Sequence, residues 1–71
     1  METKVEVFGT RIKQELKAKN KKQIDLAKHL NVQPSTLSEW LNGKNEPPMK
    51  TIVDIAVYLE VSTDYLLGLE N

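Results

Sequence analysis

A chain of 71 residues is long enough for one small domain, so residues 1–71 are expected to form a single unit. The chain has no cysteine, which excludes a disulfide framework and a cysteine-ligated zinc site. Ten basic and ten acidic residues cancel, and this zero net charge argues at first against a nucleic-acid partner.

The sequence also argues against a membrane partner. No apolar run approaches the ~18 residues that a span needs. The start, Met1-Glu2-Thr3-Lys4, is acidic and polar, unlike a secretory signal. We therefore expect a cytoplasmic protein. The end at 69–71 also leaves open a boundary before a further oligomerisation or ligand domain.

The zero net charge hides a gradient along the chain. Residues 1–22 hold seven basic and three acidic side chains, a net +4, whereas residues 23–44 are neutral and residues 45–71 carry a net −4. A charged run is most often a solvated helix surface. One positive face can nevertheless bind an anionic partner, so the total charge does not exclude nucleic acid.

Apolar residues recur at helical spacing and predict five helices, with no strand. The first runs from about Val7 to Lys19, with its apolar side chains at Phe8, Ile12 and Leu16. The second is short, and its apolar positions are Ile24, Ala27 and Leu30. The third begins at Pro34, where a missing N–H costs nothing, and stops before Gly43. Its apolar side chains are Leu37, Trp40 and Leu41.

The fourth and fifth helices follow a rigid loop over residues 45–48, which contains two prolines. The fourth is the most apolar segment and the expected centre of the core, with apolar positions at Met49, Ile52, Val53, Ala56, Val57 and Leu59. Ser62 is a good N-cap for a last helix through Leu67, and Gly68 ends it.

The spacing between the second and third helices predicts a helix-turn-helix over about residues 23–42. Ala27 is small enough for the two helices to approach closely. Asn31 occupies the turn position that requires a left-handed backbone, which asparagine tolerates well. Val32 and Leu37 are expected to pack beneath the turn.

Three stretches carry a resemblance to a known family: Gln23–Lys44, Ile52–Leu59 and Val61–Leu67. Together they resemble the DNA-binding domain of the Cro and lambda-repressor (XRE-like) helix-turn-helix family, over roughly residues 8–68. The resemblance implies a compact all-α bundle of five helices and a double-stranded DNA partner. Its third helix would lie in the major groove.

The resemblance also implies which residues contact DNA. Base contacts fall on the outward side of the third helix, at Pro34, Ser35, Ser38 and Glu39. Phosphate contacts fall on Gln23, Asn42, Lys44 and Asn45, with Lys21, Lys22 and Arg11 adding charge at the rim. Two departures from the family pattern are Lys21, where an apolar residue is usual, and Lys22, where a Ser or Thr helix cap is usual.

A third helix reads only half a site, so we expect a homodimer on a palindromic operator, acting as a phage-type or bacterial repressor. The expected dimer surface is Tyr65, Leu66, Leu67 and Leu69. The alternative is an antitoxin or antirepressor-type module whose main partner is a protein. No catalytic set, cofactor, metal site or small-molecule ligand is expected.

Several residues have a plainer interpretation. Trp40 lies three residues after Leu37 and is expected in the core, not stacked on a base. His29 has no set of ligands around it and is expected to be an exposed helix residue. Lys4, Lys17 and Lys19 are expected to be solvated.

Overall fold

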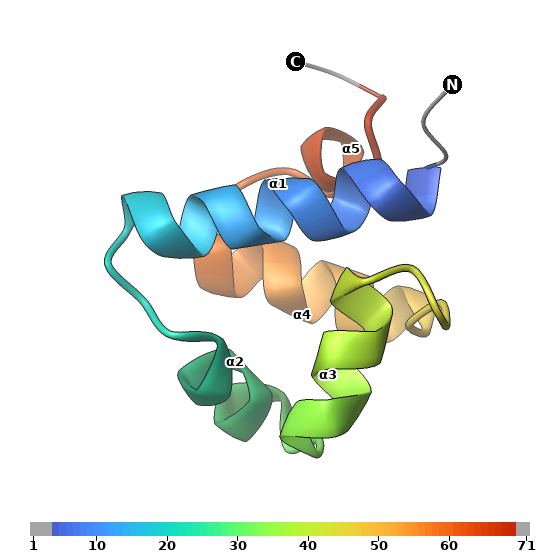
Figure 1. The fold of residues 1–71 in the computed structure, drawn as a ribbon. Helices are drawn as coiled ribbons and strands as arrows, with labels where there is room; N and C mark the ends of the chain where they lie inside the picture. Colours follow the sequence, from blue (N-terminus) through green and yellow to red (C-terminus); the bar gives the residue numbers. More distant parts are fainter. Residues whose placement is uncertain (1–3, 70–71) are drawn as a thin grey trace.

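The computed structural model describes residues 4–69, which form helices and no strand. α1 spans Lys4–Ala18, α2 Gln23–Leu30, α3 Pro34–Leu41, α4 Met49–Leu59 and α5 Thr63–Leu66 (Figure 1). The predicted all-α fold with five helices is confirmed. Residues 1–3 of the polar start at 1–4, and residues 70–71 of the possible boundary at 69–71, lie outside the described residues. No helix in the described part is long and apolar enough to cross a membrane.

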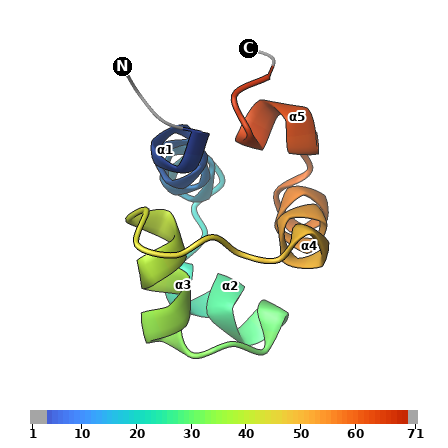
Figure 2. The ribbon, with the colours of Figure 1, turned by 90° about the vertical axis from the view of Figure 1, so that its right-hand side faces the viewer.

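The helices surround a common centre (Figure 2). α1 packs on α3 and on α5, α4 packs on α2 and on α5, and α2 packs on α3. α3 and α4 therefore lie on opposite sides of the molecule, with the helix-turn-helix pair α2–α3 at one end and α5 at the other (Figure 2).

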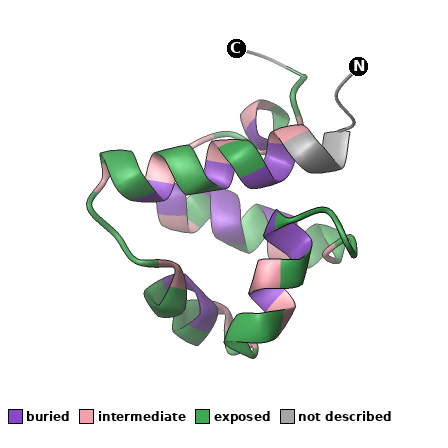
Figure 3. Cartoon of the chain, viewed as in Figure 1, coloured by how far each residue is buried: buried purple, intermediate pink, exposed green. Residues whose placement is uncertain are grey.

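Every helix contributes at least one fully buried side chain to a single core. These side chains are Ile12 from α1, Leu26 from α2, Leu37 from α3, Ile55 and Leu59 from α4, and Leu66 from α5. Burial of each such side chain stabilises the fold by about 1.5–3 kcal/mol. Figure 3 shows these buried segments facing inward on all five helices.

Every helix also ends in the same backbone motif. Asn20, Asn31, Gly43, Glu60 and Gly68 all have a left-handed backbone, with φ between 56° and 78°. The N–H of the following residue donates to the carbonyl five residues earlier, at 2.8–3.0 Å in all five cases. This is the Schellman geometry, which satisfies carbonyls that a helix end leaves open. The predicted left-handed roles of Asn31 and Gly43 are confirmed.

Two predictions about the helices need correction. The first helix begins at Lys4, not Val7, because residues 4–6 contain no glycine or proline that would prevent a helix. The fourth helix does not bury all its apolar residues: Met49, Val53 and Val57 are exposed, whereas Ile55 is fully buried. This helix is apolar on two faces, and its sequence does not distinguish which face meets the core.

Candidate nucleic-acid interface

α3 is held to the core on one face and open to solvent on the other. Leu37, Trp40 and Leu41 are buried, which confirms that Trp40 is a core residue. The opposite face carries the four predicted base-contact residues, of which Pro34, Ser35 and Glu39 are exposed and Ser38 is half-buried. Spacings of three and four residues, as in Ser35–Ser38 and Ser35–Glu39, make these side chains neighbours on the helix surface.

The turn before α3 fixes the direction in which that face points. Asn31 has φ 58° and ψ 44°, and its N–H donates to the Lys28 carbonyl. Ala27 is buried in the core, and Val32 packs against the core. The turn is therefore anchored to the core by residues on both sides of Asn31.

The N-terminal end of α2 carries the first group of predicted phosphate contacts. Lys22 is the N-cap residue and makes no side-chain cap hydrogen bond, and Gln23 is the first residue of the helix. Lys21 and Lys22 are exposed, and the Nζ of Lys21 lies 4.3 Å from the centre of the Tyr58 ring. Helix N–H groups and two ammonium groups together favour an anion at this end.

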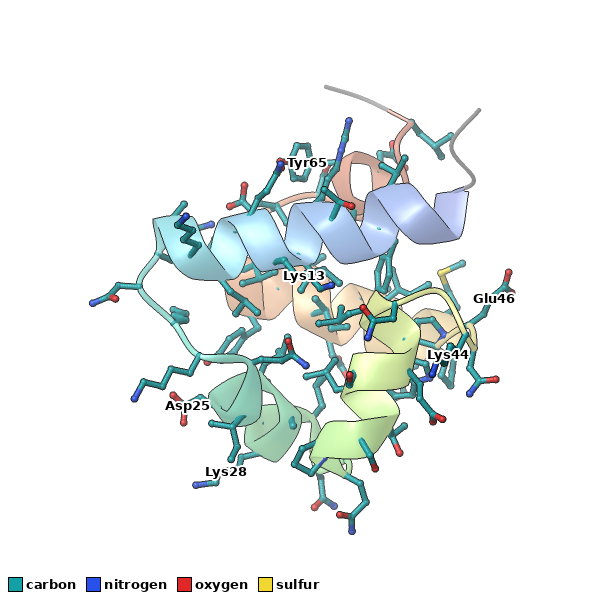
Figure 4. The ribbon with its side chains drawn as sticks, viewed as in Figure 1. Lys13, Asp25, Lys28, Lys44, Glu46 and Tyr65 are labelled. Atoms are coloured by element: carbon teal, nitrogen blue, oxygen red, sulfur yellow. The ribbon has the colours of Figure 1, made fainter. Side chains whose placement is uncertain are left out.

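The exit from α3 carries the second group, and it includes a residue that the sequence did not indicate. The Nζ of Lys13 donates to Oδ1 of Asn42 at 3.0 Å, and Nδ2 of Asn42 lies 3.3 Å from Oγ of Ser38. Figure 4 shows Lys13 between α1 and α3, and Lys44 beside the end of α3. The chain Lys13–Asn42–Ser38 thus connects a predicted phosphate contact to a predicted base contact.

Arg11 does not join these groups. Its Nη1 donates to the carbonyl oxygen of Tyr65 at 2.5 Å, and its guanidinium lies 4.5 Å from the centre of the Tyr65 ring. The Tyr65 hydroxyl donates to Oε2 of Glu15 at 3.3 Å. The structure therefore places Arg11 at the contact between α1 and α5, beside Tyr65, and Figure 4 shows Tyr65 on the far side of α1 from α3.

Lys19 is half-buried, so the prediction that it is solvated is wrong. Its Nζ forms an ion pair with Glu15 at 3.0 Å and also donates to the carbonyl oxygen of Leu59 at the end of α4. This half-buried lysine connects α1 to α4, and a cation near a helix C-terminus is favourable.

A comparison with protein-family models gives one match. The model described as helix-turn-helix matches residues 12–66, well over half of the chain, and this range includes α2, the turn and α3. The chain belongs to this helix-turn-helix family, of the XRE and lambda-repressor type. No curated protein and no solved structure shows a significant match. The helix-turn-helix chain is thus a DNA-binding transcription regulator, of a family that is regulatory and not typically enzymatic.

The four residues expected at a dimer surface of this helix-turn-helix protein are not equally accessible. Leu66 is fully buried, so its side chain has no surface left for a partner and it is removed from the predicted interface. Tyr65 and Leu67 are half-buried and pack against the core. Leu69 is 60% exposed and is the most accessible of the four.

Metal-ligating groups and pockets were looked for in the described part of this helix-turn-helix chain. No group of three or more His, Asp or Glu side chains there is placed to hold a metal ion, and no pocket is found. His29 is exposed as expected, and its ring packs against that of Tyr58 with 4.6 Å between centroids.

Proposed function

We propose that the protein is a sequence-specific repressor that binds a palindromic operator as a homodimer. The observation that carries the proposal is that the exposed face of α3 lies between two groups of exposed polar and basic side chains, which are the predicted phosphate contacts. One group lies at the start of α2 and the other at the exit from α3. Because the described helices share one core, we propose that the chain acts as a single domain, with its motif at about residues 23–42. We also propose a cytoplasmic location for this regulator.

Base recognition is assigned to the exposed face of α3 in the major groove. Ser35 and Ser38 can donate to or accept from base edges, and Glu39 can accept from a cytosine amino group. Pro34 has only apolar surface to offer, which suits a thymine methyl group. Such a surface favours specificity built from a few hydrogen bonds and one apolar contact.

Phosphate recognition is assigned to the two flanking groups. Gln23, Lys22 and Lys21 hold one backbone segment, and Asn42, Lys44 and Asn45 hold the other. Lys13 is added here because it already donates to Asn42. α2 and α3 also carry exposed carboxylates, Asp25 and Glu39, which repel phosphate and weaken binding to unrelated sequences.

Dimer formation supplies the second half-site. Two copies related by a two-fold axis present two α3 helices about one DNA turn apart, ~34 Å. We assign this contact to the exposed Leu69 with Leu67 and Tyr65, next to the end of α5. A dimer seated on an operator excludes other proteins from that DNA, and repression is the expected outcome.

Selection from a pool of random duplexes at low salt tests the proposal. We expect enrichment of an inverted repeat whose half-sites lie one helical turn apart. Gln23→Ala or Lys44→Ala should weaken binding to all sequences, whereas Ser35→Ala should change the preferred sequence. If no sequence is enriched, the main partner is a protein, as in an antitoxin or antirepressor module.

A further inference from the structure

The outer face of α4 carries a line of exposed apolar side chains in addition to its buried apolar face. Met49, Val53 and Val57 are 64%, 43% and 71% exposed, and they follow one another at four-residue intervals. Side chains at this spacing form a continuous line on a helix. We call these three residues the α4 stripe.

The α4 stripe lies apart from the exposed face of α3. Its helix packs inward through Ile52, Ile55 and Ala56. α3 lies on the opposite side of the molecule from α4 (Figure 2). The stripe is therefore separate from the face of α3 that meets DNA.

We propose that the α4 stripe is a self-association surface on which a second copy of this chain packs with its α4 antiparallel. Centred on Val53, such a pair sets Met49 of each copy against Val57 of the other, so the three apolar positions of one copy lie opposite those of its partner. This proposal needs no DNA and does not rest on the operator function.

The charges beside the stripe favour this orientation. Lys50 and Asp54 each follow a stripe residue by one position and therefore lie along the same edge of it. A two-fold axis perpendicular to both helices keeps this edge of one copy beside the same edge of its partner. Lys50 then lies only ~3 Å along the helix axis from Asp54 of the other copy, at 1.5 Å per residue.

A parallel pair has no such complementarity. Its two-fold axis runs along the helices and places the Lys50–Asp54 edge of one copy against the Ile52–Ala56 edge of the other. The charges thus select the antiparallel arrangement, while the apolar stripe supplies the attraction. Three side chains cover far less than the ~800 Å² per partner of a standard interface, so the association is weak in solution.

This pairing has a consequence for DNA. Because α3 and α4 lie on opposite sides of each copy, a pair joined through the stripe has its two α3 helices on its outer sides (Figure 2). Both α3 helices stay accessible, and such a pair can hold two separate duplex segments.

Disulfide trapping tests the contact at its centre. The chain has no native cysteine, so Val53→Cys introduces a single thiol at the proposed two-fold axis. Under mild oxidation we expect it to form a covalent dimer faster than Ile24→Cys, a matched control because Ile24 is a 50% exposed apolar residue on α2. If the two variants cross-link at the same rate, the proposal is wrong.

Charge exchange tests the orientation. Lys50→Glu and Asp54→Lys each create two like-charge contacts across the pair. In chains that also carry Leu69→Glu, to disrupt the dimer contact assigned at the end of α5, we expect each to raise the Kd of the remaining association about tenfold in sedimentation analysis. An equimolar mixture should regain the Kd of the chain with Leu69→Glu alone, because each mixed pair again joins opposite charges. If the charge changes acted only within a single helix, mixing the two variants would not restore the association. If the mixture associates no better than either variant alone, the antiparallel pair is excluded.

Folding of both charge variants is checked by circular dichroism. If either one fails to fold, the rate of Val53→Cys cross-linking relative to Ile24→Cys decides the question alone.

Discussion

Glu60 holds a backbone conformation that suits glycine better. Its φ is 58°, and in the described residues the other left-handed positions are asparagine or glycine. A side chain with a Cβ costs about 1–2 kcal/mol in this region. We expect Glu60→Gly to raise the free energy of unfolding by about 1 kcal/mol in urea titrations. Glu60→Gln removes only the charge, so equal gains for both variants would contradict backbone strain as the cause.

Lys13 is expected to contribute to DNA affinity as a cation beside Asn42 at the proposed phosphate site. Replacement by Met keeps the length of the side chain and removes its hydrogen bond to Oδ1 of Asn42. Because the pair is exposed, we expect the free energy of unfolding to change by less than about 1 kcal/mol. The log–log slope of DNA affinity against salt should fall by about 1 per copy in fluorescence anisotropy.

Lys17→Met is the matched control for this prediction. It removes the same charge from α1, one turn further from the exit of α3, and Lys17 is exposed. An equal loss of affinity in both variants would show that only the net charge of α1 matters.

The sequence predicts single residues well where the chemistry is local. Asn31 in its turn and Ser62 at its helix cap act on backbone atoms within five positions, and both predictions are confirmed. Lys13 and Lys19 act on groups 29 and 40 residues away. Those contacts depend on how α1 packs across α3 and α4, which no local pattern encodes.

α2 begins without the cap that its family usually has. Lys22 is the N-cap residue and makes no side-chain cap hydrogen bond. We expect Lys22→Ser to raise the free energy of unfolding by about 1 kcal/mol. The same change should lower DNA affinity, because one cation at the proposed phosphate site is lost. Thermal unfolding and anisotropy titrations measure the two effects separately.

Lys22→Ala separates the two effects, since it removes the charge and adds no cap. It should bind DNA as weakly as Lys22→Ser and gain no stability. Unchanged DNA affinity in both variants would remove Lys22 from the phosphate site.

Gly9 fixes the distance between α1 and the end of α3. A Cβ built there would lie 1.9 Å from the carbonyl oxygen of Leu41. Gly→Ala in an open helix is stabilising by about 0.5–1 kcal/mol. Here the clash with the Leu41 backbone makes the same substitution destabilising. We expect Gly9→Ala to lower the free energy of unfolding by about 3 kcal/mol. A variant more stable than wild type in urea would show that α1 and α3 can separate without cost.

Helical periodicity predicts the elements better than it predicts their faces. All five helices form close to their expected positions, because caps and left-handed residues mark most of their ends. In α4, however, apolar residues occur on two faces, and only the packing of α2 and α5 shows that Ile55 is inside and Val57 outside. A surplus of apolar residues over what one face can hold is the signal that predicts such a stripe.

The positive charge of residues 1–22 is divided by the fold. Arg11 and Lys19 contact α5 and α4, whereas Lys13 contacts the exit of α3, and Lys21 and Lys22 precede α2. The charge gradient along the sequence suggests that the whole segment faces DNA. In the folded protein only some of these basic side chains lie on the side of the predicted DNA contacts. The net charge of a segment therefore overestimates the number of cations available to phosphate.

The salt dependence of operator binding measures this reduced number. Four lysines of each copy are assigned to phosphate: Lys13, Lys21, Lys22 and Lys44. Each ion pair contributes about −0.9 to the slope of log affinity against log salt, so two copies on a full operator should give about −7. One copy on a half-site should give about half that slope.

Anisotropy titrations over a series of NaCl concentrations, with full and half operators, determine both values. Because Arg11 lies at the contact between α1 and α5 and not beside α2 or the exit of α3, Arg11→Met should leave the slope unchanged. Lys44→Met should reduce the slope by about 2 on the full operator, one unit per copy. Equal slopes on full and half operators would contradict the dimer. A slope near zero would contradict the phosphate contacts themselves, and the neutral net charge would then be the better guide to the partner.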